Sequence, residues 1–304
     1  MKKDFLSAKE MLPYSSPTRA MYVGAPGKVG ALRLGFELDN DGKCIMRDHE
    51  RVAPLIVQRE LYCDRTMPEM PVVYILSSGG PNVDGDRYSQ SIEMRKGSFA
   101  HITTGAATKI AEMKDNFSAL YQSIRLDDDC YLEYMPEVTI PCRHSRYITY
   151  TDIECHSSAT LFYSEIFACG RKYYGDGEIF KYDIISVCCN ACRNDGKRLF
   201  REKFVIRPGD DDVRNIGIMG IYDIFANVIV MTPHDCAEEI YAKVDPVMTD
   251  TFVVGITRLP NNAGLLYKVL GKETEPVKKN VRAFCSIVRE TVKGKPLSDD
   301  FPWR

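Results

Sequence analysis

Short runs of alternating apolar and polar residues recur along most of this 304-residue chain. Residues 31–38 read Ala-Leu-Arg-Leu-Gly-Phe-Glu-Leu, with apolar side chains mostly at every second position, which is the period of a strand with one buried face. Comparable runs occupy residues 55–60, 72–76, 99–103, 119–126, 131–135, 147–154, 160–167, 179–187 and 228–231. Many short strands that do not alternate with helices predict a mainly β fold and argue against βαβ units.

Two identical turn sequences lie between such runs. Residues 40–43 and residues 194–197 both read Asn-Asp-Gly-Lys. An Asp-Gly pair between two strands is typical of a type I′ hairpin turn, in which both central residues have positive φ. The pattern therefore predicts one hairpin around Gly42 and another around Gly196.

Helical periodicity is confined to the last quarter of the chain. In residues 275–292 the apolar positions repeat at i, i+4 and i+7, which predicts an amphipathic helix. Asp235 is expected to cap a shorter helix that ends near Tyr241. The sequence thus predicts about two helices near the C-terminus. We expect the basic face of the longer helix to be solvated, with docking to a partner as the alternative; its residues are Lys278, Lys279, Arg282 and Arg289.

Composition limits the classes of binding partner and the cellular compartment that we expect for this chain. Forty basic and forty-two acidic residues give a formal net charge of -2, so no sequence-wide attraction to nucleic acid or to acidic membranes is expected. No uninterrupted apolar run approaches the roughly 18 residues of a membrane-spanning helix. Eleven cysteines without a secreted-domain spacing fit free thiols in a reducing cytoplasm. Without a linker or a composition break, we expect residues 22–304 to form one domain, preceded by an extension of residues 1–21.

The glycine-rich segment at residues 24–30 does not have the spacing of a phosphate-binding loop. It reads Gly-Ala-Pro-Gly-Lys-Val-Gly, with two residues between the first two glycines instead of four. Val29 stands where a Ser or Thr hydroxyl would contact Mg²⁺. We therefore expect no nucleotide hydrolysis by this chain itself.

Cysteine chemistry supplies two alternative functions. A stable metal-binding protein could use the thiols of Cys188, Cys189 and Cys192, although a closed zinc site normally needs a second pair of ligands. A Cys–His hydrolase could be built from neighbouring residues, although sequence neighbours seldom form such a dyad. The two pairs that come into question are Cys142 with His144 and Cys155 with His156.

An ordered series of motifs gives the most specific signal. It runs from Gly-Lys-Val-Gly at 27–30 to Arg-Leu-Pro at 258–260 and includes Pro-Leu-Ile-Val-Gln-Arg at 54–59, Leu-Tyr-Cys-Asp at 61–64, Ser-Gly-Gly at 78–80, Gly-Asp-Arg-Tyr at 85–88, Thr-Thr-Gly-Ala-Ala-Thr-Lys at 103–109, Leu-Glu-Tyr-Met-Pro-Glu at 132–137, Ile-Pro at 140–141, Gly-Arg at 170–171 and Gly-Glu at 177–178. This series closely resembles the urease accessory protein UreD (UreH) family, and the resemblance covers residues 22–292.

The resemblance implies a fold and a set of partners. Members of that family look like an irregular β-helix of many short strands with two helices, and they have no catalytic activity. The resemblance implies direct binding to a UreF-type protein, which recruits a UreG-type GTPase, in a 2:2:2 complex that docks on apo-urease. Nickel would pass in transit through an internal tunnel, with no stably bound cofactor, and residues 258–292 are the expected contact with the UreF-type partner.

The resemblance also gives candidate residues for the polar lining of that tunnel. Those that stand in the family's motifs are Asp64, Asp86, Arg87, Thr103, Thr104, Glu137 and Glu178. Asp86, Glu137 and Glu178 are the candidates for transient nickel contacts. Arg87 is expected to order its loop through a carboxylate partner. The small residues of 103–109 either pack tightly where a strand bends or line a narrow polar passage.

Overall fold

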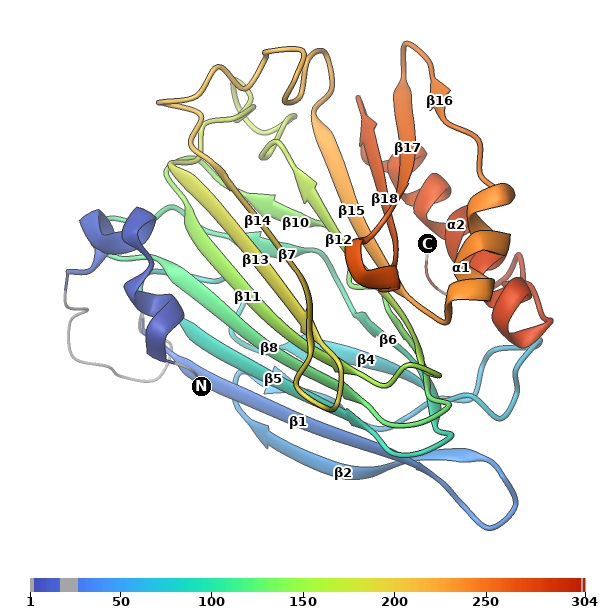
Figure 1. Ribbon diagram of the computed structural model, residues 1–304. Helices are drawn as coiled ribbons and strands as arrows, with labels where there is room; N and C mark the ends of the chain where they lie inside the picture. The colour runs from blue at the N-terminus through green and yellow to red at the C-terminus, as the bar shows by residue number, and fades with distance from the viewer. Residues whose placement is uncertain (1–2, 17–26, 302, 304) are drawn as a thin grey trace.

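Two β-sheets form the body of the protein (Figure 1). The computed structural model describes residues 3–16, 27–301 and 303. Residues 17–21 of the expected extension and residues 24–26 of the glycine-rich segment lie outside this part of the chain. In the described part, no helix is both long and apolar enough to span a membrane.

The seven-stranded sheet has the strand order β14-β13-β11-β8-β5-β1-β2. Its strands are β1 (Val29–Leu38), β2 (Cys44–Val52), β5 (Arg87–Met94), β8 (Ser118–Leu126), β11 (Arg146–Cys155), β13 (Ile184–Cys192) and β14 (Arg198–Ile206). The five strands from β1 to β13 pair in parallel, whereas β2 and β14 close the two edges as antiparallel hairpin strands.

The eleven-stranded sheet has the order β16-β17-β18-β15-β12-β9-β6-β4-β3, and β10 and β7 join it through β12. Its strands are β3 (Leu55–Ile56), β4 (Val72–Ser77), β6 (Phe99–Thr104), β7 (Thr108–Ile110), β9 (Tyr131–Tyr134), β10 (Thr139–Pro141), β12 (Thr160–Ala168), β15 (Ile224–Met231), β16 (Val247–Met248), β17 (Phe252–Arg258) and β18 (Gly264–Gly271).

The chain passes back and forth between the two sheets as it advances. From β4 to β13 the longer strands fall in turn in the eleven-stranded and the seven-stranded sheet, and each pairs in parallel with the strand one coil earlier. No helix in the described residues connects these parallel strands, and the chain instead advances by coils that alternate between the two sheets. The predicted fold class is confirmed: the protein is mainly β, with two α-helices near the C-terminus.

Both predicted hairpins are present, but their turns differ from the expected type. β1 pairs with β2 around Gly42, and β13 pairs with β14 around Gly196. The two glycines have φ of 79° and 84°, whereas Asp41 and Asp195 are not among the residues with positive φ. A type I′ turn needs positive φ at both central residues, so that prediction is wrong. Only the glycine provides the left-handed conformation that returns the chain.

Helix α1 (His234–Ala242) and helix α2 (Thr274–Lys293) lie beside the eleven-stranded sheet (Figure 1). The ring of Phe284 on α2 stacks on Tyr267 of β18, with centroids 4.1 Å apart. Asp235 lies in the first turn of α1 and the N-cap position is Pro233, so the predicted capping role of Asp235 is wrong. The carboxylate instead lies near the positive end of the helix dipole.

The basic residues of α2 are mostly buried, which contradicts the expected solvated face. Arg289 is fully buried and Lys278 is 9% exposed. Arg282 donates to backbone carbonyls of the C-terminal segment, including those of Ser298 and Phe301. Of the four, Lys279 alone is exposed. The periodic pattern gives the side of the helix on which a charge lies, but not the segment that covers that side.

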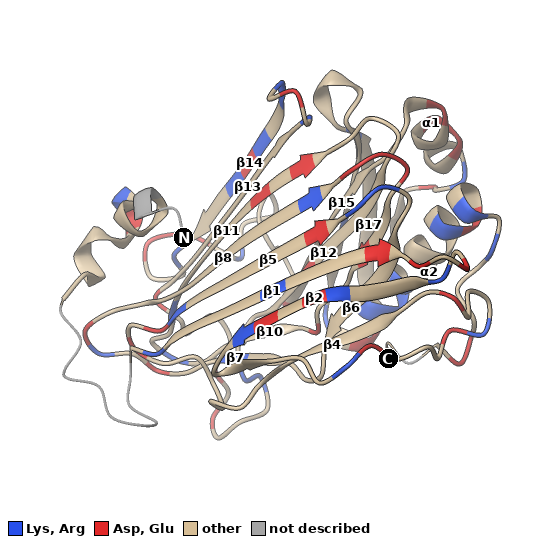
Figure 2. Ribbon diagram, turned by 90° about the horizontal axis from the view of Figure 1, so that it is seen from below, with Lys and Arg blue, Asp and Glu red and all other residues tan. Residues whose placement is uncertain are grey.

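Residues 3–16 form two short 3₁₀ turns (Lys3–Ser7 and Lys9–Tyr14), and a third 3₁₀ turn, Pro260–Asn262, precedes β18. Phe5 and Met11 are buried in one apolar cluster with Phe117 of the loop before β8. The Glu10 carboxylate forms an ion pair with the Lys203 ammonium of β14, with Nζ and Oε1 2.6 Å apart. Basic and acidic residues both occur along the strands of the seven-stranded sheet (Figure 2).

Candidate functional site

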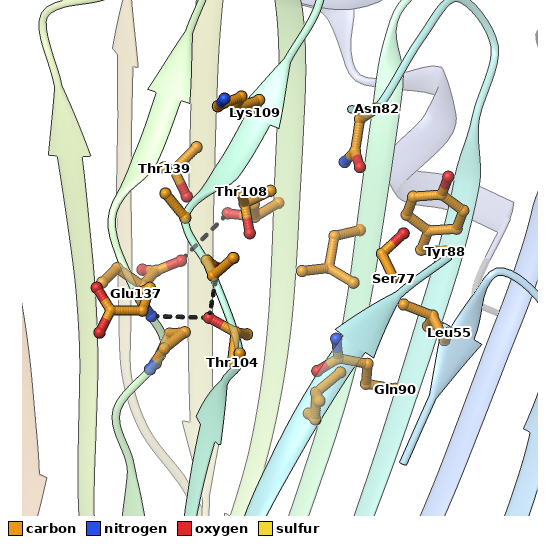
Figure 3. A pocket seen from close by; sticks show the side chains of 18 of the residues that line it. Leu55, Ser77, Asn82, Tyr88, Gln90, Thr104, Thr108, Lys109, Glu137 and Thr139 are labelled. Carbon is orange, nitrogen blue, oxygen red and sulfur yellow. Dashed lines mark hydrogen bonds between the residues drawn. The ribbon is translucent and has the colours of Figure 1, made fainter. Parts of the chain in front are cut away.

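A cavity of about 440 Å³ lies between the two sheets. Its lining combines strands of both sheets with the connection between β6 and β7 (Figure 3). The polar lining residues are Ser77, Asn82, Tyr88, Gln90, Thr104, Thr108, Lys109, Gln122, Tyr134, Glu137, Thr139, Tyr147, Thr149 and Glu165. Figure 3 places Glu137 and Thr104 on one side of this cavity and Tyr88, Gln90 and Leu55 on the other. Apolar side chains such as Leu76 and Phe167 separate these polar groups, and the space is large enough to admit water or a small ion.

A layer of buried polar side chains forms part of this wall. The Tyr134 hydroxyl accepts a hydrogen bond from Gln122 Nε2 at 2.5 Å and donates to Gln90 Oε1 at 2.9 Å. Gln122 Oε1 accepts from Thr151 and from Tyr163, each at 3.1 Å. The parallel register of β5, β8 and β11 places Gln90, Gln122 and Thr151 side by side. Such a layer is retained in a core because its members satisfy one another.

Glu165 is the exception in this layer. It points from β12 into the cavity wall and is 7% exposed. Thr149 donates to Glu165 Oε1 at 3.4 Å, while Oε2 has no hydrogen-bond partner among the described residues. Burial raises the pKa of Glu165 from 4.5 to about 7, because an ionised carboxylate is poorly solvated there. A carboxylate that is ready to gain or lose a proton near neutral pH can exchange that proton for a cation.

Two of the predicted tunnel residues line this cavity. Thr104 Oγ1 accepts a hydrogen bond from the Glu137 backbone N–H at 2.9 Å, which fixes the connection between β9 and β10. The two carboxylate oxygens of Glu137 accept from Lys278 Nζ at 2.8 and 2.7 Å. Lys278 belongs to α2, so this pair connects the cavity wall to the C-terminal helix.

The small residues of 103–109 lie where the backbone packs tightly, and most of them also border the cavity. Residues 104–109 all line it. At Gly105 a Cβ atom would lie 2.2 Å from Leu76 Cδ2, so the backbone also packs tightly against β4. Thr103 is not part of the cavity lining, and its hydroxyl donates to the Met135 carbonyl at 2.7 Å.

Asp86 and Arg87 lie outside the cavity and organise the loop before β5. Asp86 is fully buried, and its oxygens accept from the Lys28 backbone N–H at 2.9 Å, Val83 N–H at 3.0 Å and Tyr88 hydroxyl at 2.8 Å. Lys28 Nζ adds an ion pair at 3.1 Å.

Arg87 orders its neighbourhood as expected, but not through a carboxylate. It donates to the Asp86 carbonyl at 3.0 Å and to Asn116 Oδ1 at 2.8 Å, and it also donates to the Phe117 carbonyl. Its guanidinium lies 4.2 Å from the Phe117 ring centroid. The predicted carboxylate partner of Arg87 is therefore wrong, since backbone carbonyls and an amide take its place.

Glu178 and Asp64 are likewise engaged in ion pairs away from the cavity, and the Asp64 pair is fully buried. Glu178 binds Arg171 through two hydrogen bonds, at 2.7 and 2.5 Å, which lower the pKa of Glu178. Asp64 accepts from Arg289 Nη1, and its other oxygen accepts from the backbone of Thr66 at 2.9 Å. Each carboxylate is held by structural partners, so none of this group faces open space.

Sequence reasoning did not single out Glu133 or Glu165, and it placed Arg289 on a solvated helix face. Glu133 is fully buried and accepts hydrogen bonds from Arg289, from the Tyr131 hydroxyl at 2.6 Å and from His101 Nδ1 at 2.7 Å. Both glutamates stand inside apolar strand runs, Leu132-Glu133-Tyr134 and Ser164-Glu165-Ile166. An acidic residue in the middle of a fully buried strand is the signal that marks them.

The two cysteine alternatives find no support in the geometry. Among residues 3–16, 27–301 and 303, no group of three His, Cys, Asp or Glu side chains could hold a metal ion, so Cys188, Cys189 and Cys192 form no such site. The imidazole of His144 faces Asp183 at 3.0 Å, and that of His156 faces Asp128 at 3.1 Å. Burial raises the pKa of the Cys155 thiol to about 12, which opposes formation of a nucleophilic thiolate.

Comparison with known proteins assigns the family. The model described as UreD urease accessory protein matches residues 28–304. The chain is 42% identical over 298 residues to urease accessory protein UreD 2 of Brucella suis biovar 1, covering 97% of this chain and 98% of that protein. It is 40% identical over 301 residues to UreD 3 of Methylorubrum populi, covering 98% and 96%, and to UreD of Photorhabdus laumondii, covering 98% and 94%. The chain therefore belongs to the UreD family of urease accessory proteins.

Proposed function

We propose that this protein is a non-enzymatic cytoplasmic scaffold for urease maturation. It binds a UreF-type protein directly and a UreG-type GTPase through that complex, in a 2:2:2 assembly. The assembly docks on apo-urease, and nickel released upon GTP hydrolysis passes through the interior of this subunit into the urease metallocentre. The nucleotide chemistry belongs to the GTPase subunit, and nickel is cargo rather than a resident cofactor.

The observation that carries this proposal is the cavity between the sheets. It is bordered by two acidic side chains, Glu137 and Glu165, and by the hydroxyls of Thr104, Thr108 and Thr149. Carboxylate and hydroxyl oxygens bind a divalent cation without the permanence of thiolate or imidazole ligands. Transit requires contacts that are weak enough to be left, and two carboxylates on separate strands or loops, spaced by hydroxyls and apolar side chains, meet that condition.

The structure ranks the candidate residues for nickel contact by whether they line the cavity. Glu137 is the first candidate for a transient nickel contact, because it lines the cavity and, among the described residues, Lys278 is the one cation that pairs with it. Glu165 is the second, because its Oε2 is unpartnered within the described chain. Asp86 and Glu178 are assigned to loop and ion-pair architecture, since the cavity lining does not include them.

The test measures urease activation in cells that supply urease, the UreF-type and UreG-type proteins, and this chain or a variant. Glu137→Gln keeps the side chain's size and removes its charge. Loss of a metal-contacting carboxylate is expected to lower urease activity and nickel content about tenfold or more. The complex itself should still assemble in a pull-down with the tagged UreF-type protein.

Asp86→Asn is the matched control, because it also neutralises one acidic residue but lies outside the cavity. Any loss that it causes should follow the amount of folded protein and of assembled complex. Full activation by Glu137→Gln and by Glu165→Gln would remove the cavity from the nickel route. Full urease activity in cells that lack this chain altogether would overturn the maturation role.

A further inference from the structure

One end of the protein carries most of its exposed apolar side chains. Of the thirteen large apolar side chains exposed in the described residues, eight lie on three segments at the top of Figure 1. The eight are Tyr173, Tyr174, Ile179, Ile216, Ile218, Ile221, Val247 and Met248. The segments are the β12–β13 connection, the β14–β15 connection and β16, and we call the eight residues the apolar end patch. Ile216 is 93% exposed, and Tyr173 and Met248 are each 80% exposed.

Hydrogen bonds join the three segments into one surface. The Tyr222 hydroxyl, in the β14–β15 connection, donates to the Thr249 carbonyl next to β16 at 2.7 Å. Lys172, in the β12–β13 connection, forms an ion pair with Asp223 at 2.9 Å. The apolar side chains of the patch therefore belong to neighbouring loops that are fixed to each other.

Hydrogen bonds within the β14–β15 connection order the loop that carries Ile216, Ile218 and Ile221. Asn215 Oδ1 accepts from the Gly217 N–H at 2.9 Å, and Arg214 donates to the Tyr222 carbonyl at 2.9 Å. Met219 is 3% exposed and anchors the loop to the body of the protein. Because the backbone is already ordered, the loop would lose little conformational entropy when a partner covers Ile216. A preorganised, exposed apolar surface is typical of an interaction site.

Charge narrows the kind of partner. Residues 171–179, 207–223 and 245–250 contain four basic and eight acidic residues, although the whole chain has a net charge of only -2. Lys172 and Arg214 pair with Asp223, Arg171 pairs with Glu178, and Asp176 pairs with Arg143 and Lys181. The acidic excess therefore lies with Asp210, Asp211, Asp212, Asp245 and Asp250. An acidic margin repels an anionic membrane, and it opposes a symmetric contact with a second copy, in which acids would face acids. It favours a protein surface rich in Lys and Arg.

We propose that the apolar end patch binds a protein partner whose apolar face is bordered by Lys and Arg side chains. This inference rests on the proposed function, under which the UreF-type subunit is the partner to test. It places that contact on the connecting loops rather than on residues 258–292, because the apolar face of α2 is already buried against the eleven-stranded sheet.

The experiment is a binding measurement between the full chain and the UreF-type protein of the same organism, co-expressed and then titrated. The test variant combines Tyr173→Asp, Ile216→Asp and Met248→Asp. The control variant places the same three charges at exposed apolar positions elsewhere, Leu12→Asp, Val52→Asp and Leu61→Asp, which are 55%, 54% and 37% exposed. Thermal unfolding of each variant establishes that all are folded.

Loss of three anchoring apolar contacts is expected to raise the Kd about 30-fold or more, whereas the control should stay within about twofold. Replacing Asp210, Asp211 and Asp212 by Asn should slow association and weaken its dependence on salt. Unchanged binding by the patch variant would overturn this inference alone. No binding by the unaltered chain would overturn the direct-partner part of the proposed function as well. A dimer of the chain alone that the patch variant abolishes would assign the surface to a second copy.

Discussion

Arg289 and Glu133 lie 156 positions apart in the sequence and meet through two hydrogen bonds, Nε to Oε1 at 2.7 Å and Nη2 to Oε2 at 2.6 Å. Arg289 also donates to Asp64, and all three side chains are fully inaccessible to solvent. Arginine beside Glu133, together with the His101 hydrogen bond, keeps the pKa of Glu133 well below its usual range despite burial. The cluster attaches α2 to the eleven-stranded sheet by charge as well as by apolar packing.

Arg289→Met should destabilise the protein strongly. The substitution leaves the carboxylates of Asp64 and Glu133 buried without their cation, and breaking a buried ion pair in this way costs about 3–5 kcal/mol of unfolding free energy. Chemical denaturation followed by the fluorescence of Trp303, the chain's one tryptophan, measures the loss. Lys279→Met, on the exposed side of the same helix, should change stability by less than about 0.5 kcal/mol. Equal stability of the two variants would contradict the role assigned to Arg289.

The distance between Arg289 and Glu133 in the sequence explains why the cluster was not predicted. Helical periodicity places Arg289 on the polar side of α2, and that information ends at the helix. Local patterns performed better: they gave most of the strands, both Asp-Gly hairpins and the long helix, since each depends on neighbours within a few residues. They missed β5, β17 and β18, which fall outside every predicted run. The coil of parallel strands depends on pairing between distant segments, and it entered through family resemblance rather than through the pattern itself.

The candidate-site residues were also predicted only in part, because the sequence does not show which motif residues face the cavity. Thr104 and Glu137 were predicted and do line the cavity. Asp86 stood in an equally distinctive motif, yet its carboxylate turns toward its own loop, where Lys28 and Tyr88 bind it. Motif residues that build a turn and motif residues that line a cavity look alike in the sequence, because both need polar side chains beside glycine.

Asp86→Asn should weaken folding rather than act on cavity chemistry. Asparagine offers one acceptor oxygen where the carboxylate accepts three hydrogen bonds and an ion pair. We expect a loss of about 2–3 kcal/mol in unfolding free energy, because hydrogen bonds to a buried charged group are costly to leave unmade. Asp115→Asn, at an exposed position, is the control for charge alone. A stable Asp86→Asn variant with impaired urease activation would contradict this structural role and make Asp86 a candidate for nickel contact again.

Gly264→Ala tests the close approach of two antiparallel strands. At Gly264 the backbone has φ of 134°, and an added Cβ atom would lie 1.9 Å from the Val230 carbonyl oxygen of β15. Both strain and overlap oppose alanine, so we expect a loss of about 3 kcal/mol or more. Gly255→Ala, in the adjacent strand β17, meets nothing within 4 Å and should be neutral or stabilising by up to about 1 kcal/mol. Denaturation midpoints of the two variants decide the matter, and similar values would rule out the proposed overlap.

The pH dependence of stability should reveal the state of Glu165. Burial raises the pKa of Glu165 from 4.5 to about 7, so the folded protein holds a proton there that the unfolded chain releases. The stabilisation from that proton is complete below about pH 4.5 and is lost as the pH rises through about 7. Glutamine cannot ionise, so Glu165→Gln should gain stability relative to the unaltered protein between pH 5 and pH 8, by up to about 3 kcal/mol.

The measurement is the difference in unfolding free energy between Glu165→Gln and the unaltered chain at several pH values. Glu137→Gln serves as the comparison, because Lys278 already neutralises that carboxylate in the cavity wall. A divalent cation that binds at Glu165 must displace its proton, and nickel added at pH 7 should therefore stabilise the unaltered chain more than Glu165→Gln. A pH-independent difference would mean that Glu165 is already ionised in the folded protein, and proton exchange could then play no part in cation transit through the cavity.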